Sequence, residues 1–130
     1  MGIIAEYLKT KFKFDFLGGY VYFNKHNEEL RDFMLKNNHK NYIVLGAYNP
    51  YPILNSEETN LKLHQDLLGK IKNDYSYFEG LGYSSDENYH EKHLIIFDMD
   101  IDQGIELGNH YGQLAICYGN SMQMSLLVIK

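Results

Sequence analysis

The segment YIVLGAY, residues 42–48, constrains the fold most, because apolar side chains fill both faces of an extended chain there. A strand that is apolar on both faces belongs in the interior of a sheet. Residues 42–48 are therefore expected to form a central strand. Other segments rich in apolar and β-branched residues are predicted to be strands, and they cover residues 11–24, 75–83, 91–99, 113–119 and 124–130. The first of these is expected to form two short strands around Gly18-Gly19.

Three further segments are predicted to be helices, over residues 27–38, 57–72 and 101–111. Each has a residue at its start whose side chain can accept a hydrogen bond from the first helical turn. The predicted N-caps are Asn27, Ser56 and Asp100. In the third helix, Gly104 and Gly108 share one face, which indicates close packing on the sheet because glycine otherwise weakens a helix.

The predicted order of elements is ββαβαββαββ. Several connections are too short for the crossovers that parallel strands need, so the sheet is expected to be mostly antiparallel. Residues 1–130 are predicted to form a single α+β domain, with a sheet of about five to six strands and three helices. A chain of 130 residues can bury a sufficient core without a disulfide or a metal.

Composition excludes several classes of function. The formal net charge of −5 opposes a large phosphate-binding surface, so nucleic acid is not an expected partner. The single cysteine, Cys117, lies in the apolar run QLAICY and is expected to be a buried thiol rather than a nucleophile. The chain shows neither a secretory signal nor an apolar run of roughly 18 residues. A cytoplasmic location without a membrane partner is therefore expected.

The histidines do not form a recognisable metal motif. HEKH, residues 90–93, lacks the spacing of His-Glu-x-x-His, and on a strand His90 and His93 point to opposite faces. Neither a metal nor a cofactor is expected.

A polar residue interrupts the apolar face of the second predicted helix. A helical projection places Asn60 and His64 on the stripe that also carries Leu67 and Ile71. A buried Asn needs hydrogen-bond partners, and the preceding loop with Asn49 can supply them. Two interpretations remain open, because Asn60 can fasten this loop or can line a pocket at the start of the helix.

Five short motifs occur in order along the chain. They are AYNP (47–50), SEETN (56–60), GLG (80–82), Glu91 before HLII, and YGQLAI (111–116). Together they resemble a bacterial family of unknown function, domain-of-unknown-function family 3293, over about residues 42 to 118. The resemblance places the polar positions of the family on Asn49, Asn60, Glu91 and Gln113, and implies no activity.

Two positions depart from the family pattern. Lys92-His93 stand where members often have a Pro-Ser-like pair, and Tyr51 stands where they often have a basic or small polar residue. If these positions contact a ligand, its identity differs from that of other members.

The leading hypothesis is a small cytosolic binding protein with a polar pocket for a small polar ligand such as a nucleotide. Asn and Gln offer paired donors and acceptors, and Tyr offers a stacking face. Asn49, Glu91 and Gln113 are expected to gather around the amino end of the 57–72 helix. The residues expected to bind the ligand are Tyr48, Asn49, Asn60, Glu91, Tyr111 and Gln113.

Two alternatives belong to other classes of protein. The first is a protein-binding inhibitor, of the immunity or anti-defence type, that acts through an acidic surface rich in the 12 tyrosines of the chain. The second is a hydrolase-like enzyme that uses Glu91 and His64. Nothing in the sequence brings those two residues together, so catalysis is not expected.

Overall fold

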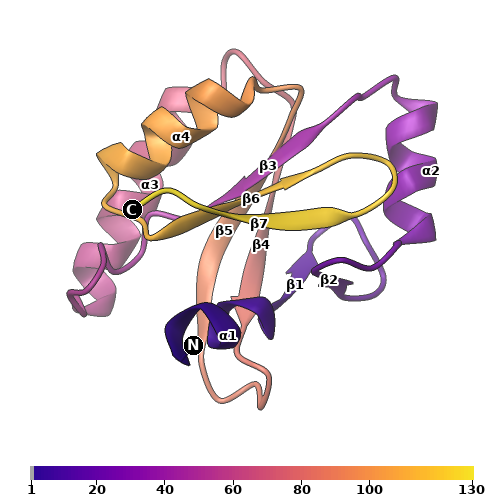
Figure 1. Cartoon of the computed structure of the whole chain (residues 1–130). Helices are drawn as coiled ribbons and strands as arrows, with labels where there is room; N and C mark the ends of the chain where they lie inside the picture. Colours follow the sequence, from indigo (N-terminus) through magenta and orange to yellow (C-terminus); the bar gives the residue numbers. More distant parts are fainter. Residues whose placement is uncertain (1) are drawn as a thin grey trace.

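The computed structural model of the chain describes residues 2–130, which contain four helices and seven strands (Figure 1). The helices are α1 (Gly2–Leu8), α2 (Glu28–Lys36), α3 (Glu57–Ile71) and α4 (Ile101–His110). The strands are β1 (Lys11–Phe14), β2 (Val21–Tyr22), β3 (Tyr42–Leu45), β4 (Tyr77–Tyr83), β5 (His90–Phe97), β6 (Ala115–Gly119) and β7 (Met124–Val128). The predicted α+β class is confirmed.

The expected numbers of strands and helices are both too small. The predicted order of elements already contains seven strands, and the described sheet includes all seven, because even the two-residue strand β2 pairs with β1, with Phe12 opposite Val21. Helix α1 is not predicted from the sequence. It has seven residues, buries none of them, and carries no acidic residue in its first turn or basic residue in its last. A helix this short lacks the length and end signals by which helices are predicted.

Two of the three predicted caps form. The Asn27 Oδ1 accepts the Leu30 N–H at 2.9 Å, and the Ser56 Oγ accepts the Thr59 N–H at 3.2 Å. Asp100 stands at the start of α4 as expected, but its side chain makes no capping bond.

The sheet has the strand order β2-β1-β4-β5-β3-β6-β7, and every neighbouring pair is antiparallel. It curls until its two edges meet: Phe23, which follows β2, bridges to Met124 of β7, and the Asn24 N–H donates to the Met124 carbonyl at 2.8 Å. The result is a nearly closed barrel. Strand β3 lies between β5 and β6, so the prediction of a central strand is confirmed.

Alternate side chains of β3 pack into two separate hydrophobic cores. Tyr42 and Val44 face the interior of the curled sheet, whereas Ile43 and Leu45 face the outer core beneath α3 and α4. All four are buried, which explains why this segment is apolar throughout. Figure 1 shows α3 and α4 on the same side of the sheet, while α2 and α1 lie near opposite ends of the barrel.

Helix α4 packs closely on the sheet through its glycines, as predicted. A Cβ atom at Gly104 would stand 3.0 Å from the Ile43 Cδ1, and one at Gly108 would stand 2.6 Å from the Ile129 Cδ1. Any larger residue would push α4 away from the outer core.

Antiparallel pairing decides where the polar residues meet. Because β5 and β6 both run opposite to β3, their starts lie beside its end. Asn49 follows β3, Glu91 lies at the start of β5, and Gln113 precedes β6. These residues therefore come to one end of the barrel, beside the start of α3.

Candidate functional site

Two asparagines lock the loop after β3 onto α3. Asn60 is 3% exposed; its Oδ1 accepts the Asn49 N–H at 2.9 Å, and its Nδ2 donates to the Asn49 Oδ1 at 2.9 Å. The same Asn49 oxygen accepts the Asn55 N–H at 2.8 Å. Asn49 has a positive φ of 48°, which Asn adopts more readily than most residues. The predicted burial of Asn60 and its bonding to the loop are confirmed.

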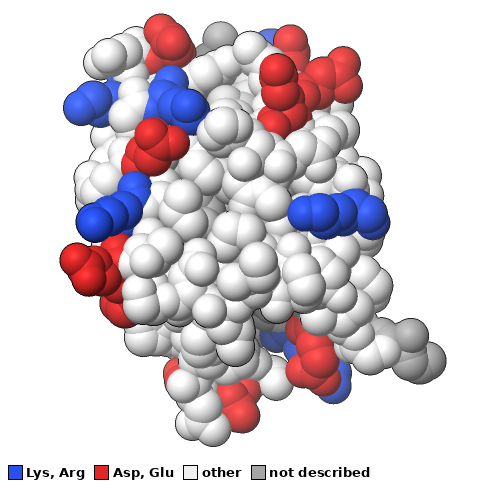
Figure 2. Space-filling view, turned by 90° about the vertical axis from the view of Figure 1, so that its left-hand side faces the viewer, with Lys and Arg blue, Asp and Glu red and all other residues white. Residues whose placement is uncertain are grey.

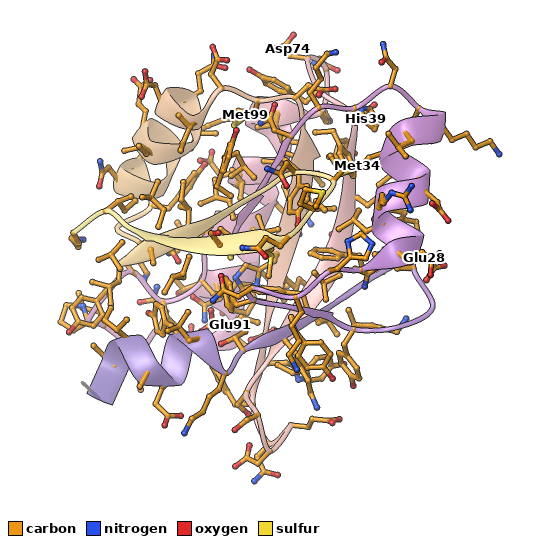
Figure 3. All side chains as sticks on the ribbon, turned by 45° about the vertical axis from the view of Figure 1, so that its right-hand side comes forward. Glu28, Met34, His39, Asp74, Glu91 and Met99 are labelled. Atoms are coloured by element: carbon orange, nitrogen blue, oxygen red, sulfur yellow. The ribbon has the colours of Figure 1, made fainter. Side chains whose placement is uncertain are left out.

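The Asn49–Asn60 pair, here called the Asn49–Asn60 lock, is also hydrogen-bonded to the carboxylate of Glu91. The Asn49 Nδ2 donates to the Glu91 Oε2 at 2.9 Å, and the Tyr89 hydroxyl donates to the same oxygen at 2.6 Å. The Glu91 Oε1 has no hydrogen-bond partner within residues 2–130. Figure 3 shows Glu91 between the end of the sheet and α1. One oxygen of the carboxylate is thus fixed and the other is available.

A cavity of about 260 Å³ opens at this end of the barrel. Small residues line it on three segments of the sheet: Gly46 just after β3, Gly82 in β4 and Ala115 in β6. In the inner core nearer α2, large side chains such as Phe14 and Phe97 fill the interior of the sheet. The change from Phe to Gly and Ala along the inner face therefore leaves a hollow.

His93 lies in this hollow between two glycines. A Cβ atom at Gly46 would stand 2.9 Å from the His93 Nε2, and one at Gly82 would stand 3.1 Å from the His93 Nδ1. The His93 ring occupies the space that ordinary side chains at these two positions would need. The absence of side chains at Gly46 and Gly82 therefore allows the imidazole to lie flat against the sheet.

The hydrogen bond of His93 determines its tautomer. Nδ1 lies 3.1 Å from the carbonyl oxygen of Glu91, and since a carbonyl only accepts, Nδ1 carries the proton. Nε2 is left as an acceptor without a partner in the described chain. Burial lowers the pKa of His93, and the neighbouring Glu91 offsets only part of this effect, so the ring is neutral near pH 7.

Gln113 is held by two backbone carbonyls. Its Nε2 donates to the Tyr48 oxygen at 3.0 Å and to the Tyr111 oxygen at 3.1 Å. Both amide hydrogens are used, and the Oε1 has no partner among residues 2–130. Gln113 therefore presents an acceptor to the cavity that it lines.

The two tyrosines expected to supply a stacking face do not line the cavity. Tyr48 and Tyr111 are both 3% exposed. The Tyr48 hydroxyl donates to Glu57 at 2.9 Å, and burial together with this bond raises the pKa of Tyr48 to about 12. The Tyr111 hydroxyl donates to Asp66 at 2.6 Å. Tyr48 instead ties the loop after β3 to α3, and Tyr111 ties the end of α4 to α3. Their backbone carbonyls accept from Gln113.

His64 does not meet Glu91. Its Nε2 lies 2.8 Å from the Glu79 Oε1, and its Nδ1 is buried without a hydrogen-bond partner. Glu79 pairs across the strands with Leu94, a residue of the outer core, whereas His93 faces the cavity. The sheet therefore separates the His64–Glu79 pair from the cavity, and the structure does not bring together Glu91 and His64, the two residues of the enzyme alternative.

The structure brings three residues to the cavity that sequence reasoning does not select: His93, Tyr89 and Tyr7. The sequence does contain a signal for His93: it follows Glu91 by two residues, and residues two apart on a strand point to the same face. For Tyr7 no signal exists, since it belongs to the unpredicted α1. Tyr7 and Glu91 both line the cavity, and the pKa of Tyr7 is raised first by burial and then by the charge of Glu91.

The lining of the cavity is acidic and partly apolar. Glu6 and Glu91 line it, and no Lys or Arg does so in the described part of the chain. Cys117 also lines it but is only 5% exposed, and burial raises the pKa of its thiol. The expectation that Cys117 is buried is confirmed. Protonated at neutral pH, its sulfur is a poor nucleophile.

Two absences hold for residues 2–130. No group of three or more His, Cys, Asp or Glu side chains is placed to hold a metal ion. None of the helices has the length and apolar character needed to cross a membrane.

Comparison with known proteins supports the suspected family. A family model described as "Protein of unknown function (DUF3293)" matches residues 45–116, which is more than half of the chain. The matched range contains the Asn49–Asn60 lock, Glu91, His93 and Gln113. No curated protein matches the chain, and no solved structure does. The chain belongs to the DUF3293 family of proteins of unknown function.

Proposed function

We propose that this protein binds a small organic molecule in the cavity at the end of its barrel. The observation that carries the proposal is Glu91: Asn49 and Tyr89 hold its Oε2, and its Oε1 is left without a partner in a concave site. A carboxylate buttressed in this way is characteristic of ligand sites, where a few fixed polar groups set the orientation of the ligand.

The size of the cavity supports a small ligand. Its 260 Å³ lies just below the range of about 300–1,000 Å³ that is common for ligand pockets. Apolar side chains form one part of the wall and offer a place for a hydrocarbon group: Phe12, Phe23, Val44 and Leu126. Polar groups of Glu91, His93 and Gln113 form another part.

The charge of the cavity restricts the ligand further. Of the two carboxylates that line it, Glu6 pairs with Lys9 at 3.5 Å, whereas Glu91 has no cationic partner among residues 2–130, so a phosphate beside Glu91 would meet repulsion without compensation. This argument favours a neutral or cationic molecule over a nucleotide. The Asn49–Asn60 lock then has a positioning role, because it holds Glu91 from outside the cavity lining.

The inhibitor alternative gains no comparable observation. Figure 2 shows the face on the left of Figure 1, where Lys and Arg stand among Asp and Glu. An acidic docking surface would need carboxylates gathered without interspersed cations.

A thermal-shift screen tests the proposal. A library of small neutral, cationic and anionic molecules is added to the wild-type protein and to Ala115→Leu, which fills the cavity. A ligand at a hundredfold its Kd should add about 2.7 kcal/mol of stability to the wild type. The expected result is one or more hits that Ala115→Leu loses and that Gln65→Leu, altered at an exposed position of α3, retains. Hits that survive Ala115→Leu, or no hits at all, would refute the proposal.

A further inference from the structure

Three hydrogen-bond acceptors line the cavity, and each is held through its other polar atom. Glu91 is held at Oε2 and leaves Oε1; His93 is held at Nδ1 and leaves Nε2; Gln113 is held at Nε2 and leaves Oε1. The geometry points to a site for a primary ammonium group: the ligand is a small primary amine whose NH₃⁺ donates to Glu91, His93 and Gln113. This inference rests on the proposed function and specifies the class of ligand.

The strand arrangement puts the three acceptors around one volume. Glu91 and His93 are two residues apart on β5 and share its inner face. Gln113 comes from the β6 side of β3, so two strand spacings, or about 10 Å, separate its backbone from that of β5. The Glu91 and Gln113 side chains shorten this separation, because Glu91 accepts from Asn49 and Gln113 donates to the carbonyl of the adjacent Tyr48. Gly46 has no side chain, so the His93 ring lies against the chain just after β3, which runs between Glu91 and Gln113.

The set of atoms matches an ammonium better than other cations. An ammonium has three N–H donors and no acceptor, and it therefore can satisfy three single acceptors. A guanidinium prefers to bind both oxygens of a carboxylate, but the Glu91 Oε2 already accepts from Asn49 and Tyr89. A quaternary ammonium has no N–H and would leave all three acceptors unsatisfied.

The remaining residues of the cavity lining indicate the chemistry of the rest of the ligand. Phe12, Phe23, Val44 and Leu126 contribute apolar surface, and neither Lys nor Arg is present in the described lining to balance an acidic group on the ligand. The expected ligand is thus a primary amine with a short aliphatic or aromatic hydrocarbon part and no carboxylate or phosphate.

Isothermal titration calorimetry with a matched set of probes tests the inference. The probes are 2-phenylethylamine and hexylamine, the N,N,N-trimethyl derivative of the first, and the neutral analogue 2-phenylethanol. The expected result is that the primary amines bind and that the trimethyl and alcohol analogues bind at least about tenfold more weakly.

Two variants connect the effect to specific atoms. Glu91→Gln keeps the size of the side chain but removes the charge, and it should weaken amine binding about ten- to hundredfold. Glu58→Gln removes the same charge from an exposed position in the first turn of α3 and should leave the affinity within about twofold. Circular dichroism and denaturant unfolding establish that both variants are folded.

The outcomes separate this inference from the proposed function. If 2-phenylethanol binds as tightly as 2-phenylethylamine and Ala115→Leu abolishes both, the cavity binds ligands but the ammonium site is refuted. Equal loss of affinity in Glu91→Gln and Glu58→Gln would also refute it, because only the overall charge would then matter. If no probe binds while the library gives other hits in the cavity, only the amine class is wrong.

Discussion

Asn49 and Asn60 bond each other twice, once from backbone to side chain and once from side chain to side chain, both at 2.9 Å. These bonds occupy the Oδ1 of each residue and leave the Asn49 Nδ2 to reach Glu91. The start of α3 thereby determines the position of a carboxylate on β5. A substitution at Asn60 should therefore change both the stability of the fold and the affinity of the cavity for a ligand.

Replacing Asn60 with leucine should destabilise the protein by about 1–3 kcal/mol. The substitution leaves the Asn49 N–H without its partner and removes one of the two donors to the Asn49 Oδ1, and an unsatisfied buried polar group carries that cost. Urea unfolding followed by circular dichroism gives the free energy difference. Gln65→Leu, at an exposed position of the same helix, is the control and should change stability by less than about 0.5 kcal/mol. A neutral or stabilising Asn60→Leu would contradict the lock.

Gly46→Ala should destabilise the protein mainly through His93. The new Cβ would stand 2.9 Å from Nε2 and 3.0 Å from Cδ2 of the ring, so the imidazole has to move. Overpacking of this kind costs typically about 1–3 kcal/mol. In a His93→Ala background most of that cost should vanish, and a double-mutant cycle measures the coupling.

The control for this cycle is Gly69→Ala. Gly69 lies in α3 with nothing within 4 Å of an added Cβ, so alanine should stabilise the helix by about 0.5–1 kcal/mol in both backgrounds. If Gly46→Ala lowers the free energy of unfolding by the same amount with and without His93, the position of the His93 ring does not require glycine at position 46.

Local sequence patterns predict the polar lock and a polar pocket, but not the small residues that shape the cavity. The burial of Asn60 follows from helical periodicity, and the Ser56 cap follows from the residues beside it. The cavity instead arises where Gly46, Gly82 and Ala115 meet. These residues belong to different strands or strand ends, and only the register of the folded sheet brings them together.

The directions of the Tyr48 and Tyr111 side chains, and the space that holds the His93 ring, are also not predictable from the local sequence. Tyr48 and Tyr111 are near the site in sequence, yet their hydroxyls bond Glu57 and Asp66 and hold the rings away from the cavity. In the sequence, His93 stands out as half of a rejected metal motif and as a departure from the family pattern. Its position on the same strand face as Glu91 follows from strand periodicity, but its slot depends on glycines from two other segments.

Cys117 should react slowly with a thiol reagent while the protein is folded. It is 5% exposed, and burial raises the pKa of the thiol, so little thiolate forms at neutral pH. Labelling with 5,5′-dithiobis(2-nitrobenzoate) in buffer and in concentrated urea measures the protection. The expected rate in buffer is at least about a hundredfold lower. Equally fast labelling in both conditions would mean that the inner face around Cys117 is open.

The free energy of unfolding should fall as the pH drops below about 6.5, in part because of His93. Burial, the largest effect, lowers the pKa of His93 in the folded state below its ordinary value of 6.5. The unfolded chain then takes up a proton more readily than the folded one, so the stabilisation present above pH 6.5 is lost as the pH falls through the folded pKa. The loss from one group is at most about 1.4 kcal/mol for each pH unit.

The variant His93→Gln isolates this contribution, because glutamine keeps a hydrogen-bonding side chain and does not titrate. Urea unfolding of both proteins at about pH 7.5 and about pH 5.5 gives four free energies. The wild type should lose more stability than His93→Gln between the two pH values, since the effects of the other histidines and carboxylates are common to both. Identical pH dependence would show that His93 is solvated like an exposed histidine, and the neutral Nε2 acceptor in the cavity would lose its support.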